Sequence, residues 1–437
     1  MLKSAAAFPI RWRIFSFLFG FGFLAYVQAK TITVAADRMM PELGLSQFQI
    51  GVIEMAFIVG YAAFQLPGGV IGQRLGARRT FVLIGLAAFA ATFATPIVPY
   101  LLSGTALFVG LLTVQAVLGL AQGPIFPISA GVFEAWFPPR HWTLVQGLQT
   151  MGLGLGAALT PPLIQSLTMR LGWQQALMWA SLPALALIAA WGWYGRNTPR
   201  EHPSVTPEEL EVIGSQPVAA HSSIKLRQLV ALMGNRNVVL LFVSYMCMNY
   251  TFYLISNWVF LYLIEERHFS ALQSSWLATA PPLGAALGAG IGGALTGVFI
   301  QRLGNLWGFR VVPLAALSLA ALLLLFAVNA SSAYAALAAL TLCFGAVELT
   351  EGAYWGAGMT VGRGDTMAVC GFMNTGGNLG GIIASPTVGY LSDHHQWRAA
   401  FLIGIGFAVV SALCWLGVSV ASVEEVPTSA EFAPQPS

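Results

Sequence analysis

The chain has 437 residues, of which 57% are hydrophobic and 8% are charged, with a formal net charge of +3. A soluble globular protein carries roughly 25% charged residues, so this composition excludes that class and indicates a membrane protein built from apolar helices. The short alternating segments of a transmembrane β-barrel are absent from the sequence, and no basic cluster suggests nucleic-acid binding.

Apolar runs between glycine, proline and charged residues predict twelve membrane-spanning helices. Each run comes close to the roughly 20 residues that a spanning helix needs. In chain order, the predicted spans cover residues 14–36, 48–73, 80–100, 105–131, 142–169, 173–195, 237–264, 271–300, 309–328, 333–359, 366–391 and 397–420.

One polar stretch, residues 196–236, interrupts these runs and predicts a cytoplasmic linker between two halves. It separates an N-terminal six-helix half, residues 1–195, from a C-terminal six-helix half, residues 237–437, which ends in a short cytoplasmic tail. Within the linker, the sequence around Pro207–Gly214 predicts a short amphipathic surface helix.

Lysine and arginine are distributed unevenly between the loops on the two sides of the predicted membrane. Because cytoplasmic loops are enriched in these residues, the bias predicts that both termini lie in the cytoplasm. The short loops favour the inner membrane of a bacterium. The outer side keeps only Arg38, Arg170, Arg267 and Arg398, whereas the inner side collects Lys3, Arg11, Arg13, Arg74, Arg78, Arg79, Arg140, Arg196, Arg200, Lys225, Arg227, Arg236, Arg302, Arg310 and Arg363.

The two halves repeat one another at a nearly constant offset, which indicates an internal duplication. The segment "IGQRLG" after the second span recurs as "FIQRLG" after the eighth, and "AQGPIF" in the fourth span matches "TEGAYW" in the tenth. The matched pairs are Gln73 with Gln301 (301 − 73 = 228), Gln122 with Glu351 (229), Gln149 with Asn374 and Pro161 with Pro386 (both 225), and Trp173 with Trp397 (224).

Duplicated six-helix halves are the plan of many secondary transporters. The segment "GGVIGQRLGARR" (68–79) resembles the loop signature G-x-x-x-D-R-x-G-x-R/K-R/K of the major facilitator superfamily. The resemblance implies an all-α membrane protein with twelve transmembrane helices in two pseudo-symmetric halves. It also implies a cytoplasmic gate, in which Gln73 replaces the signature's acid, at Gly69, Gln73, Arg74, Gly76 and Arg78.

Further segments resemble the anion:cation symporter family of that superfamily, which carries organic anions such as sugar acids. The family's charged positions in the N-terminal half hold Gln28, Ala29, Gln115 and Gln122 here, so its coupling mechanism does not transfer directly. The segments are "YVQAKTITVAA" (26–36), "FQLPGG" (64–69), "GPIFP" (123–127), "AWFPPR" (135–140) and "NTGGNLGG" (374–381).

In this superfamily the first, fourth, seventh and tenth spans line the cavity, and the polar residues of this chain gather there. Lys30 is the only basic residue well inside an apolar helix, ~24 Å from the cytoplasmic end of its span at 1.5 Å per residue. Two interpretations stay open for it: an anion-binding charge, or a lysine that snorkels towards the outer surface. Asn249, Tyr253 and Asn257 form one stripe in the seventh span, because residues four apart share a helix face. We expect this stripe to line the cavity, with anchoring at the membrane interface as the alternative.

The expected substrate-binding residues combine these positions with matches to the symporter family. Tyr61, Trp355 and Asn374 match positions where that family keeps the same residue types near its substrate. For Gln115 and Gln122, contacts between helices are the alternative. The full set is Tyr26, Gln28, Lys30, Tyr61, Gln115, Gln122, Gln149, Asn249, Tyr253, Asn257, Trp355 and Asn374.

Glu351 and Glu348 are carboxylates inside the apolar tenth span. An ionisable residue at membrane depth is costly and is a candidate functional residue. Residues three apart lie on one helix face, and two carboxylates this close in a low dielectric should not both ionise. We therefore expect the pair to carry proton coupling, with a hydrogen bond from Glu351 to a neighbouring helix as the alternative.

These features predict a secondary transporter that works by alternating access on a small organic anion, either a monocarboxylate or a sugar acid, as a proton symporter. A facilitator or symporter of a neutral or zwitterionic solute is the alternative, and a membrane sensor that binds without transport is a third interpretation. No catalytic, cofactor or metal-binding motif is present in the sequence, so we expect neither an enzyme nor a metal site. We expect the protein to work as a monomer in the lipid bilayer.

Overall fold

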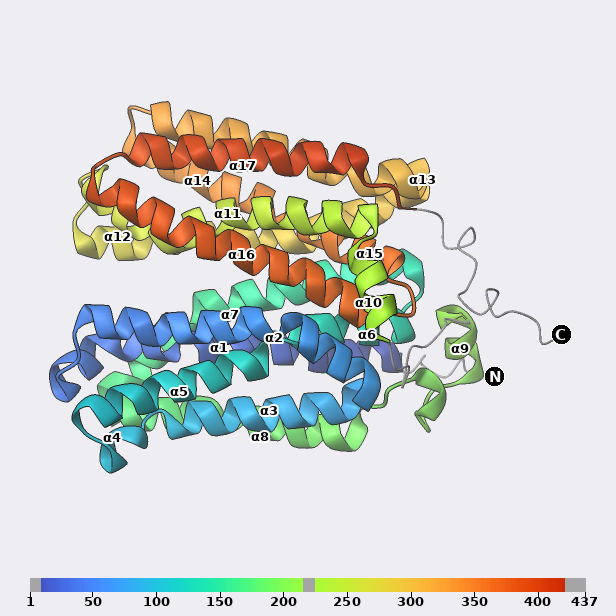
Figure 1. The fold of residues 1–437 in the computed structure, drawn as a ribbon, viewed down its shortest axis with the longest axis horizontal. Helices are drawn as coiled ribbons and strands as arrows, with labels where there is room; N and C mark the ends of the chain where they lie inside the picture. Colours follow the sequence, from blue (N-terminus) through green and yellow to red (C-terminus); the bar gives the residue numbers. More distant parts are fainter. Residues whose placement is uncertain (1–8, 215–224, 421–437) are drawn as a thin grey trace, which may run out of the picture.

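The computed structural model describes residues 9–214 and 225–420, and every regular element in that part of the chain is a helix (Figure 1). The predicted all-α fold class is therefore confirmed. The predicted C-terminal tail after residue 420 lies outside the described residues.

The N-terminal half is a bundle of long, nearly parallel helices with short connections. Ser46 caps the second of them: its side chain accepts a hydrogen bond from the backbone N–H of Gln49, and the Gln49 side chain accepts one from the backbone N–H of Ser46. This reciprocal cap satisfies donors that a helix start leaves free. The elements are α1 (Ile10–Leu43), α2 (Gln47–Leu75), α3 (Ala77–Ala94), α4 (Val98–Leu101), α5 (Gly104–Gln122), α6 (Ile125–Trp136), η1 (Pro139–His141), α7 (Trp142–Leu171) and α8 (Trp173–Tyr194).

The first part of the linker region folds onto the N-terminal half, whereas its last helix packs against the C-terminal half. As the sequence predicts near Pro207–Gly214, a short helix forms there, and Glu209 accepts hydrogen bonds at 3.0 Å from the backbone N–H groups of Ile10 and Arg11. A carboxylate is favourable at this position because the start of α1 presents unpaired N–H groups. The elements are η2 (Pro199–Glu201), α9 (Pro207–Ile213) and α10 (Leu226–Met233).

The C-terminal half repeats the arrangement of long helices. Its largest buried side chains include Trp355, Trp397 and Trp415, which pack between the helices of this half. The elements are α11 (Arg236–Glu265), α12 (Ala271–Leu277), α13 (Ala280–Asn329), α14 (Ala333–Glu348), α15 (Glu351–Val361), α16 (Thr366–Asp393) and α17 (Trp397–Gly417).

Within the described residues, 9 segments are long and apolar enough to cross a membrane. One of them is the 50-residue α13, which turns at Gly304 (φ 74) and so joins the predicted eighth and ninth spans. Two further helices, α7 and α16, have spanning lengths of 30 and 28 residues. The number twelve stays a prediction.

Three predicted spans differ from the structure in detail. The eighth was expected to start at residue 271, but that stretch is the separate α12, and α13 starts at Ala280. The following prolines lie in the first turn of α13, where a missing N–H costs nothing. The fourth span breaks at Gly123–Pro124 and the tenth at Leu349–Thr350, so neither is one continuous helix. Both breaks fall beside the matched pair Gln122 and Glu351.

The duplication extends to a repeated contact between the first and last long helices of each half. In the N-terminal half, the Trp173 indole donates to Glu42 Oε2 at 2.7 Å. In the C-terminal half, the Trp397 indole donates to Glu265 Oε2 at 3.3 Å. The two glutamates are related by an offset (265 − 42 = 223) close to that of the two tryptophans. We call these two contacts the Glu–Trp pairs.

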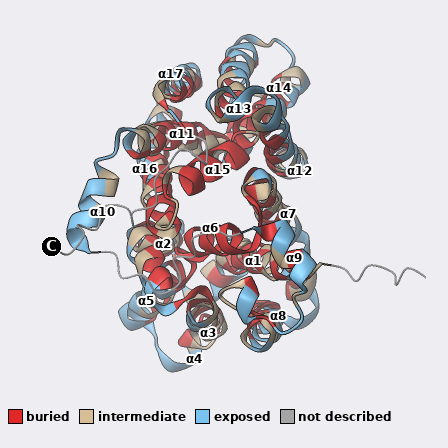
Figure 2. Cartoon of the chain, turned by 90° about the vertical axis from the view of Figure 1, so that its right-hand side faces the viewer, coloured by how far each residue is buried: buried red, intermediate tan, exposed pale blue. Residues whose placement is uncertain are grey.

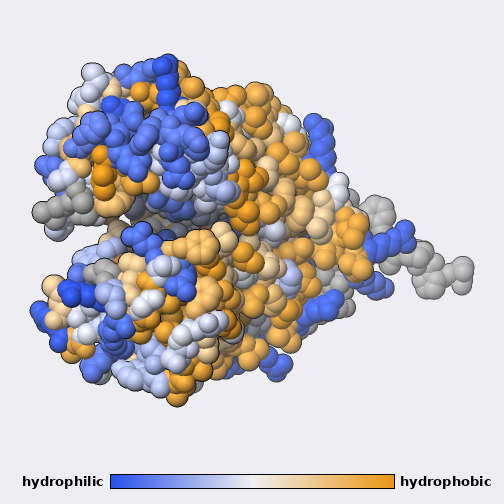
Figure 3. Space-filling model, turned by 60° about the vertical axis from the view of Figure 1, so that its left-hand side comes forward, coloured by the Kyte–Doolittle hydropathy of each residue, from blue (hydrophilic) through white to orange (hydrophobic). Residues whose placement is uncertain are grey.

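The two halves touch at one end of the molecule and separate at the other. We call the end where α1 begins and α17 ends the closed end, and the opposite end, with α4 and α12, the open end (Figure 1). In Figure 3 the surface is hollowed between the halves towards the open end. The contacts between halves join α2 with α16 and α7 with α13. Glycines allow the close approach, since a Cβ at Gly293 would overlap the backbone oxygen of Thr143.

Candidate functional site

Two carboxylates lie at the break between α14 and α15 in the C-terminal half. Glu348 is the last residue of α14 and Glu351 the first of α15, and they are 4% and 5% exposed. They do not share one unbroken helix, as the sequence suggested, but they still interact electrostatically. Among the described residues, Glu348 accepts no hydrogen bond from a side chain.

Glu351 is held by two hydrogen-bond donors. The Trp355 indole N–H donates to Glu351 Oε2 at 2.8 Å, and the Tyr245 hydroxyl donates to the same oxygen at 3.2 Å. The Trp355 ring also packs against Phe126 of α6 in the other half, with ring centroids 5.7 Å apart. Trp355 therefore links the carboxylate to the interface between the halves.

The polar stripe of α11 continues further than predicted. Tyr245 lies one turn before Asn249 and belongs to the same face, so the periodicity that selected Asn249, Tyr253 and Asn257 could also have found it. The Asn249 side chain donates to the Tyr245 backbone oxygen at 2.9 Å, so this hydrogen bond lies within α11. Tyr253 donates to Asn378 Oδ1 of α16 at 3.4 Å. Asn257 is exposed towards the open end.

A polar cluster joins the two halves between α2 and α16. Asn374 Nδ2 donates to Gln65 Oε1 at 2.8 Å, and the Tyr61 hydroxyl interacts with both side chains. The buried Gln65 Nε2 has no hydrogen-bond partner. Sequence reasoning missed Gln65, although it lies one turn after Tyr61 on the same helix face. Tyr61 and Asn374 are therefore brought together as expected, with an additional amide between them.

The glutamines of the N-terminal half lie in two separate places. Gln122 Nε2 donates to Gln28 Oε1 at 3.0 Å, so these two buried amides pair between α5 and α1. Gln149 Nε2 instead donates to Ser129 Oγ at 2.7 Å, inside the bundle. Gln115 is also buried, and its Oε1 has no partner. The predicted group of glutamines is thus not one continuous surface.

Tyr26 and Lys30 share the face of α1 that looks towards the other half. Tyr26 lies near Tyr61, Tyr253 of α11 and Glu348, which places it between the halves. Lys30 follows one turn later and therefore lies nearer the open end on the same face. Its interacting carboxylate is Glu54 of α2, and within the described residues no acidic oxygen lies within 4.0 Å of it. In this conformation Lys30 and Glu351 have different partners.

The closed end is fastened by Gln73, which stands where the family signature has its acid. Gln73 Nε2 donates to Asp365 Oδ1 at 2.6 Å and to the Gly364 backbone oxygen at 3.2 Å, in the turn between α15 and α16. From α6, the buried Glu134 accepts a hydrogen bond at 3.0 Å from the N–H of Gly364. We call Gln73, Glu134, Gly364 and Asp365 the closed-end latch. Sequence reasoning missed the last three residues.

The other predicted gate positions have different surroundings. A Cβ at Gly69 would overlap the backbone oxygen of Met367, so this glycine allows contact between the halves. Gly76 has φ +82 and separates α2 from α3. The Arg78 side chain donates to Gly192 O at 3.0 Å within the N-terminal half, so the structure does not place it between the halves. Arg74 is exposed near the end of α2.

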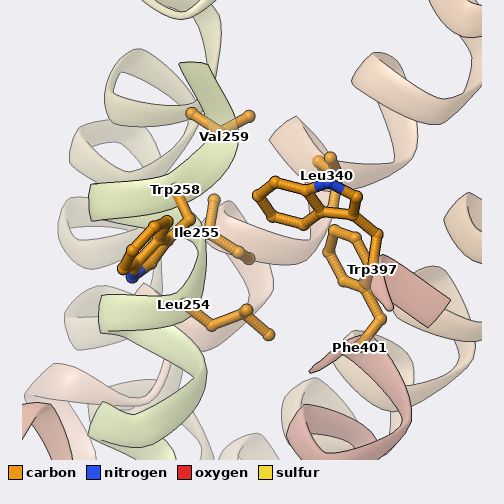
Figure 4. A pocket seen from close by; sticks show the side chains of 7 residues that line it. All are labelled: Leu254, Ile255, Trp258, Val259, Leu340, Trp397 and Phe401. Atoms are coloured by element: carbon orange, nitrogen blue, oxygen red, sulfur yellow. The ribbon is translucent and has the colours of Figure 1, made fainter. Parts of the chain in front are cut away.

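A small apolar pocket lies elsewhere, inside the C-terminal half between α11, α14 and α17 (Figure 4). Trp258 and Trp397 bring the only indole nitrogens to its wall. It offers no charge for an anion, and it is separate from the interface between the halves. We do not assign it to the transport path. Its lining residues are Leu254, Ile255, Trp258, Val259, Leu340, Trp397 and Phe401.

Comparison with known sequences agrees with this architecture. The model of the Major Facilitator Superfamily matches residues 18–362 and 275–437. The chain is 27% identical to a probable sulfoacetate transporter of Cupriavidus necator over 91% of both chains. It is 26% identical to a hexuronate transporter of Bacillus subtilis over 91% of this chain and 92% of the relative. A probable galactarate/D-glucarate transporter of Escherichia coli is 24% identical over 90% of this chain and 89% of the relative.

Solved structures show the same fold at low sequence identity. The fucose:proton symporter of Escherichia coli matches with a TM-score of 0.69 and 18% identity, over 94% of this chain and 99% of that chain. The human organic anion transporter MFSD10 matches with a TM-score of 0.68 and 16% identity, over 93% and 100%.

Proposed function

Because this chain belongs to the Major Facilitator Superfamily, we propose that it is a secondary transporter that moves a small organic anion across a membrane by alternating access. The relatives are named for sulfoacetate, hexuronate, and galactarate or D-glucarate, which are all organic acids. The chain is a transporter rather than an enzyme. With its halves apart at the open end, the structure corresponds to a state in which substrate enters from that side.

The observation that carries the anion assignment is the pair Tyr26 and Lys30 on the inner face of α1. Among the described residues, Lys30 is the one basic residue well inside an unbroken helical span, because Arg302 and Arg310 flank the turn at Gly304 of α13. Glu54 is the carboxylate that interacts with Lys30, but it lies beyond the 4.0 Å of an ion pair. One cation suits one carboxylate or sulfonate. Amides and phenols nearby, such as Gln28 and Tyr61, can hydrogen-bond the hydroxyl groups of a sugar acid.

The test is a thermal-shift and counterflow assay with a panel of carboxylates, sulfonates and their neutral analogues. A ligand at a hundred times its dissociation constant adds about 2.7 kcal/mol to the stability of the purified protein. We expect acids alone to give this shift and to drive counterflow. Lys30→Ala should weaken the effect at least tenfold, whereas Lys30→Arg should keep part of it.

Arg170→Ala is the matched control, because Arg170 is an exposed basic residue at the open end outside the inner face of α1. Acids that bind Lys30→Ala and the control equally well would remove Lys30 from the site. Stabilisation by neutral or zwitterionic analogues only would favour the alternative function, which is transport of a neutral or zwitterionic solute. The hydrogen-bonded amides of Gln28 and Gln122 are the observation that supports this alternative.

We further propose that Glu351 carries a proton that couples to transport, with Glu348 sharing it. Both donors on Glu351 reach Oε2, and Oε1 accepts no hydrogen bond from the described residues. Oε1 is therefore available for a proton. Because the Trp355 ring touches Phe126 of the other half, a change of charge on Glu351 acts on a side chain at the interface. Adjacent acids in a low dielectric favour a shared proton.

Glu351→Gln tests this assignment, since the amide keeps the shape but holds no titrating proton. Uptake driven by a pH gradient should fall to background, while counterflow, which needs no net proton movement, should continue. Glu348→Gln should weaken the coupling less. Acid-driven uptake that persists in Glu351→Gln would end the coupling assignment and leave the anion assignment intact.

The closed end is assigned to the cytoplasm, and both termini with it. This side carries most of the arginine and lysine residues, as cytoplasmic loops do. We propose a bacterial inner membrane as the location and a monomer as the working unit. Labelling of single cysteines from outside intact cells, at Tyr100→Cys of the open end and Leu306→Cys of the closed end, distinguishes the two orientations. Only Tyr100→Cys should react.

A further inference from the structure

The short helix α10 lies across the direction of the long helices at the closed end (Figure 1). Viewed onto that end, α10 sits on the outer edge of the molecule beside α16 (Figure 2). It packs against α16 and α11. The long helices follow the membrane normal, so α10 runs within the plane of the membrane surface.

One side of α10 is apolar and remains uncovered by protein. Leu226 and Val230, one turn apart, are 75% and 62% exposed. Leu229, Leu232 and Met233 are half-buried against the neighbouring helices. A short helix with this pattern lowers its free energy by placing its apolar side in the boundary between headgroups and acyl chains.

The charged residues next to α10 along the chain have a single sign. Lys225 and Arg227 are exposed at its start, and Arg236 is exposed at the start of α11. From residue 212 to residue 264 the sequence has no aspartate or glutamate. Basic residues beside an apolar helix face on the inner side of a membrane attract anionic lipid headgroups. A soluble protein partner would be in competition with the bilayer for the same apolar side.

We propose that α10 is an interfacial anchor that inserts Leu226 and Val230 into the cytoplasmic leaflet and binds anionic phospholipid headgroups through Lys225, Arg227 and Arg236. Its neighbour α16 begins directly after Asp365 of the closed-end latch. Lipid bound at α10 therefore acts on a helix that holds the closed end together. The prediction is a transport rate that depends on anionic lipid.

The test places spin labels on the two sides of α10 in the full chain. Val230→Cys and Gln228→Cys are labelled in a Cys414→Ser background, because the other three cysteines are buried. In vesicles of phosphatidylcholine with phosphatidylglycerol, the label at 230 should be accessible to oxygen and shielded from a water-soluble nickel complex. The label at 228 should show the reverse. Equal accessibility at both positions would overturn the insertion.

The headgroup contact is tested by charge removal. Each basic residue near an anionic surface strengthens attachment about fivefold, so Lys225→Gln with Arg227→Gln should reduce the ratio of inserted to released α10 about 25-fold in these vesicles. High salt should act in the same direction. In phosphatidylcholine alone, the double variant should match the unmodified protein.

Arg200→Gln is the control, because Arg200 is exposed at the closed end but lies in the linker segment on the N-terminal half. It should respond to phosphatidylglycerol like the unmodified protein. A double variant with an unchanged lipid response in label accessibility and in counterflow would refute the headgroup contact. Both readouts concern lipid dependence, so they fail or succeed independently of which anion is transported.

Discussion

The closed-end latch gives a prediction whose size follows from its hydrogen bonds. Gln73→Ala removes the donor that reaches Asp365 at 2.6 Å and the Gly364 backbone oxygen at 3.2 Å. A hydrogen bond to a charged group contributes about 1.5–3 kcal/mol net, and one between neutral groups about 0.5–1.5 kcal/mol. The variant should therefore lose about 2 kcal/mol or more of stabilisation.

Only the conformation in which the halves touch at the closed end loses this stabilisation. Gln73 belongs to one half and the turn at Gly364 and Asp365 to the other, so these bonds break when the halves separate at the closed end. At about 1.4 kcal/mol per factor of ten, a loss of 2 kcal/mol shifts the equilibrium about 30-fold towards a state with the closed end apart. Gln73→Glu should shift it further, because it sets a second carboxylate against Asp365.

The assay is a distance measurement between spin labels at the closed end, on Leu75→Cys in α2 and Leu306→Cys in α13. Both native side chains are exposed there, at 40% and 39%. The long-distance population should grow in Gln73→Ala. Gln301→Ala is the matched control, since Gln301 is the repeat partner of Gln73 and is exposed. A distribution in Gln73→Ala that matches this control would refute the latch.

Two further predictions concern one contact at the open end of the molecule and one in the linker at the closed end. Glu42→Ala leaves the Trp173 indole, which is 2% exposed, without its hydrogen-bond acceptor. The purified protein should therefore lose about 1–3 kcal/mol of stability in thermal denaturation. Glu266→Ala is the control, because Glu266 is an exposed acid of the same end, and it should keep the stability of the unmodified protein. His202 packs against Trp136 and Tyr194, and burial, with Arg196 nearby, lowers the pKa of His202 below its ordinary value. Because the folded linker then prefers the neutral imidazole, its attachment is strongest above about pH 6.5 and weakens as the pH falls. Tryptic cleavage at Arg200 should therefore become faster below that pH in the unmodified protein. In His202→Phe, the cleavage rate should not show this increase. The same increase in the variant would contradict the assignment to His202.

The sequence alone determined the fold class, the approximate positions of the long helices and the duplication. These depend on local properties: apolar length reports burial in the bilayer, and a stripe such as Asn249, Tyr253 and Asn257 reports one helix face. The same signals predicted α9 within the linker. The resemblance to the symporter family, and not a local pattern, selected Tyr61 and Asn374, which the structure brings into one cluster with Gln65.

Only the tertiary structure decided which side chains meet across the halves. Gln73 and Asp365 are 292 residues apart, and Asn374 and Gln65 are 309 apart, so no local pattern relates them. The helix breaks beside Gln122 and Glu351 also escaped prediction, because hydropathy measures apolar length and not backbone continuity. Which residues touch at the closed end depends further on the conformation, since one sequence must satisfy its polar groups in more than one arrangement of the same two halves.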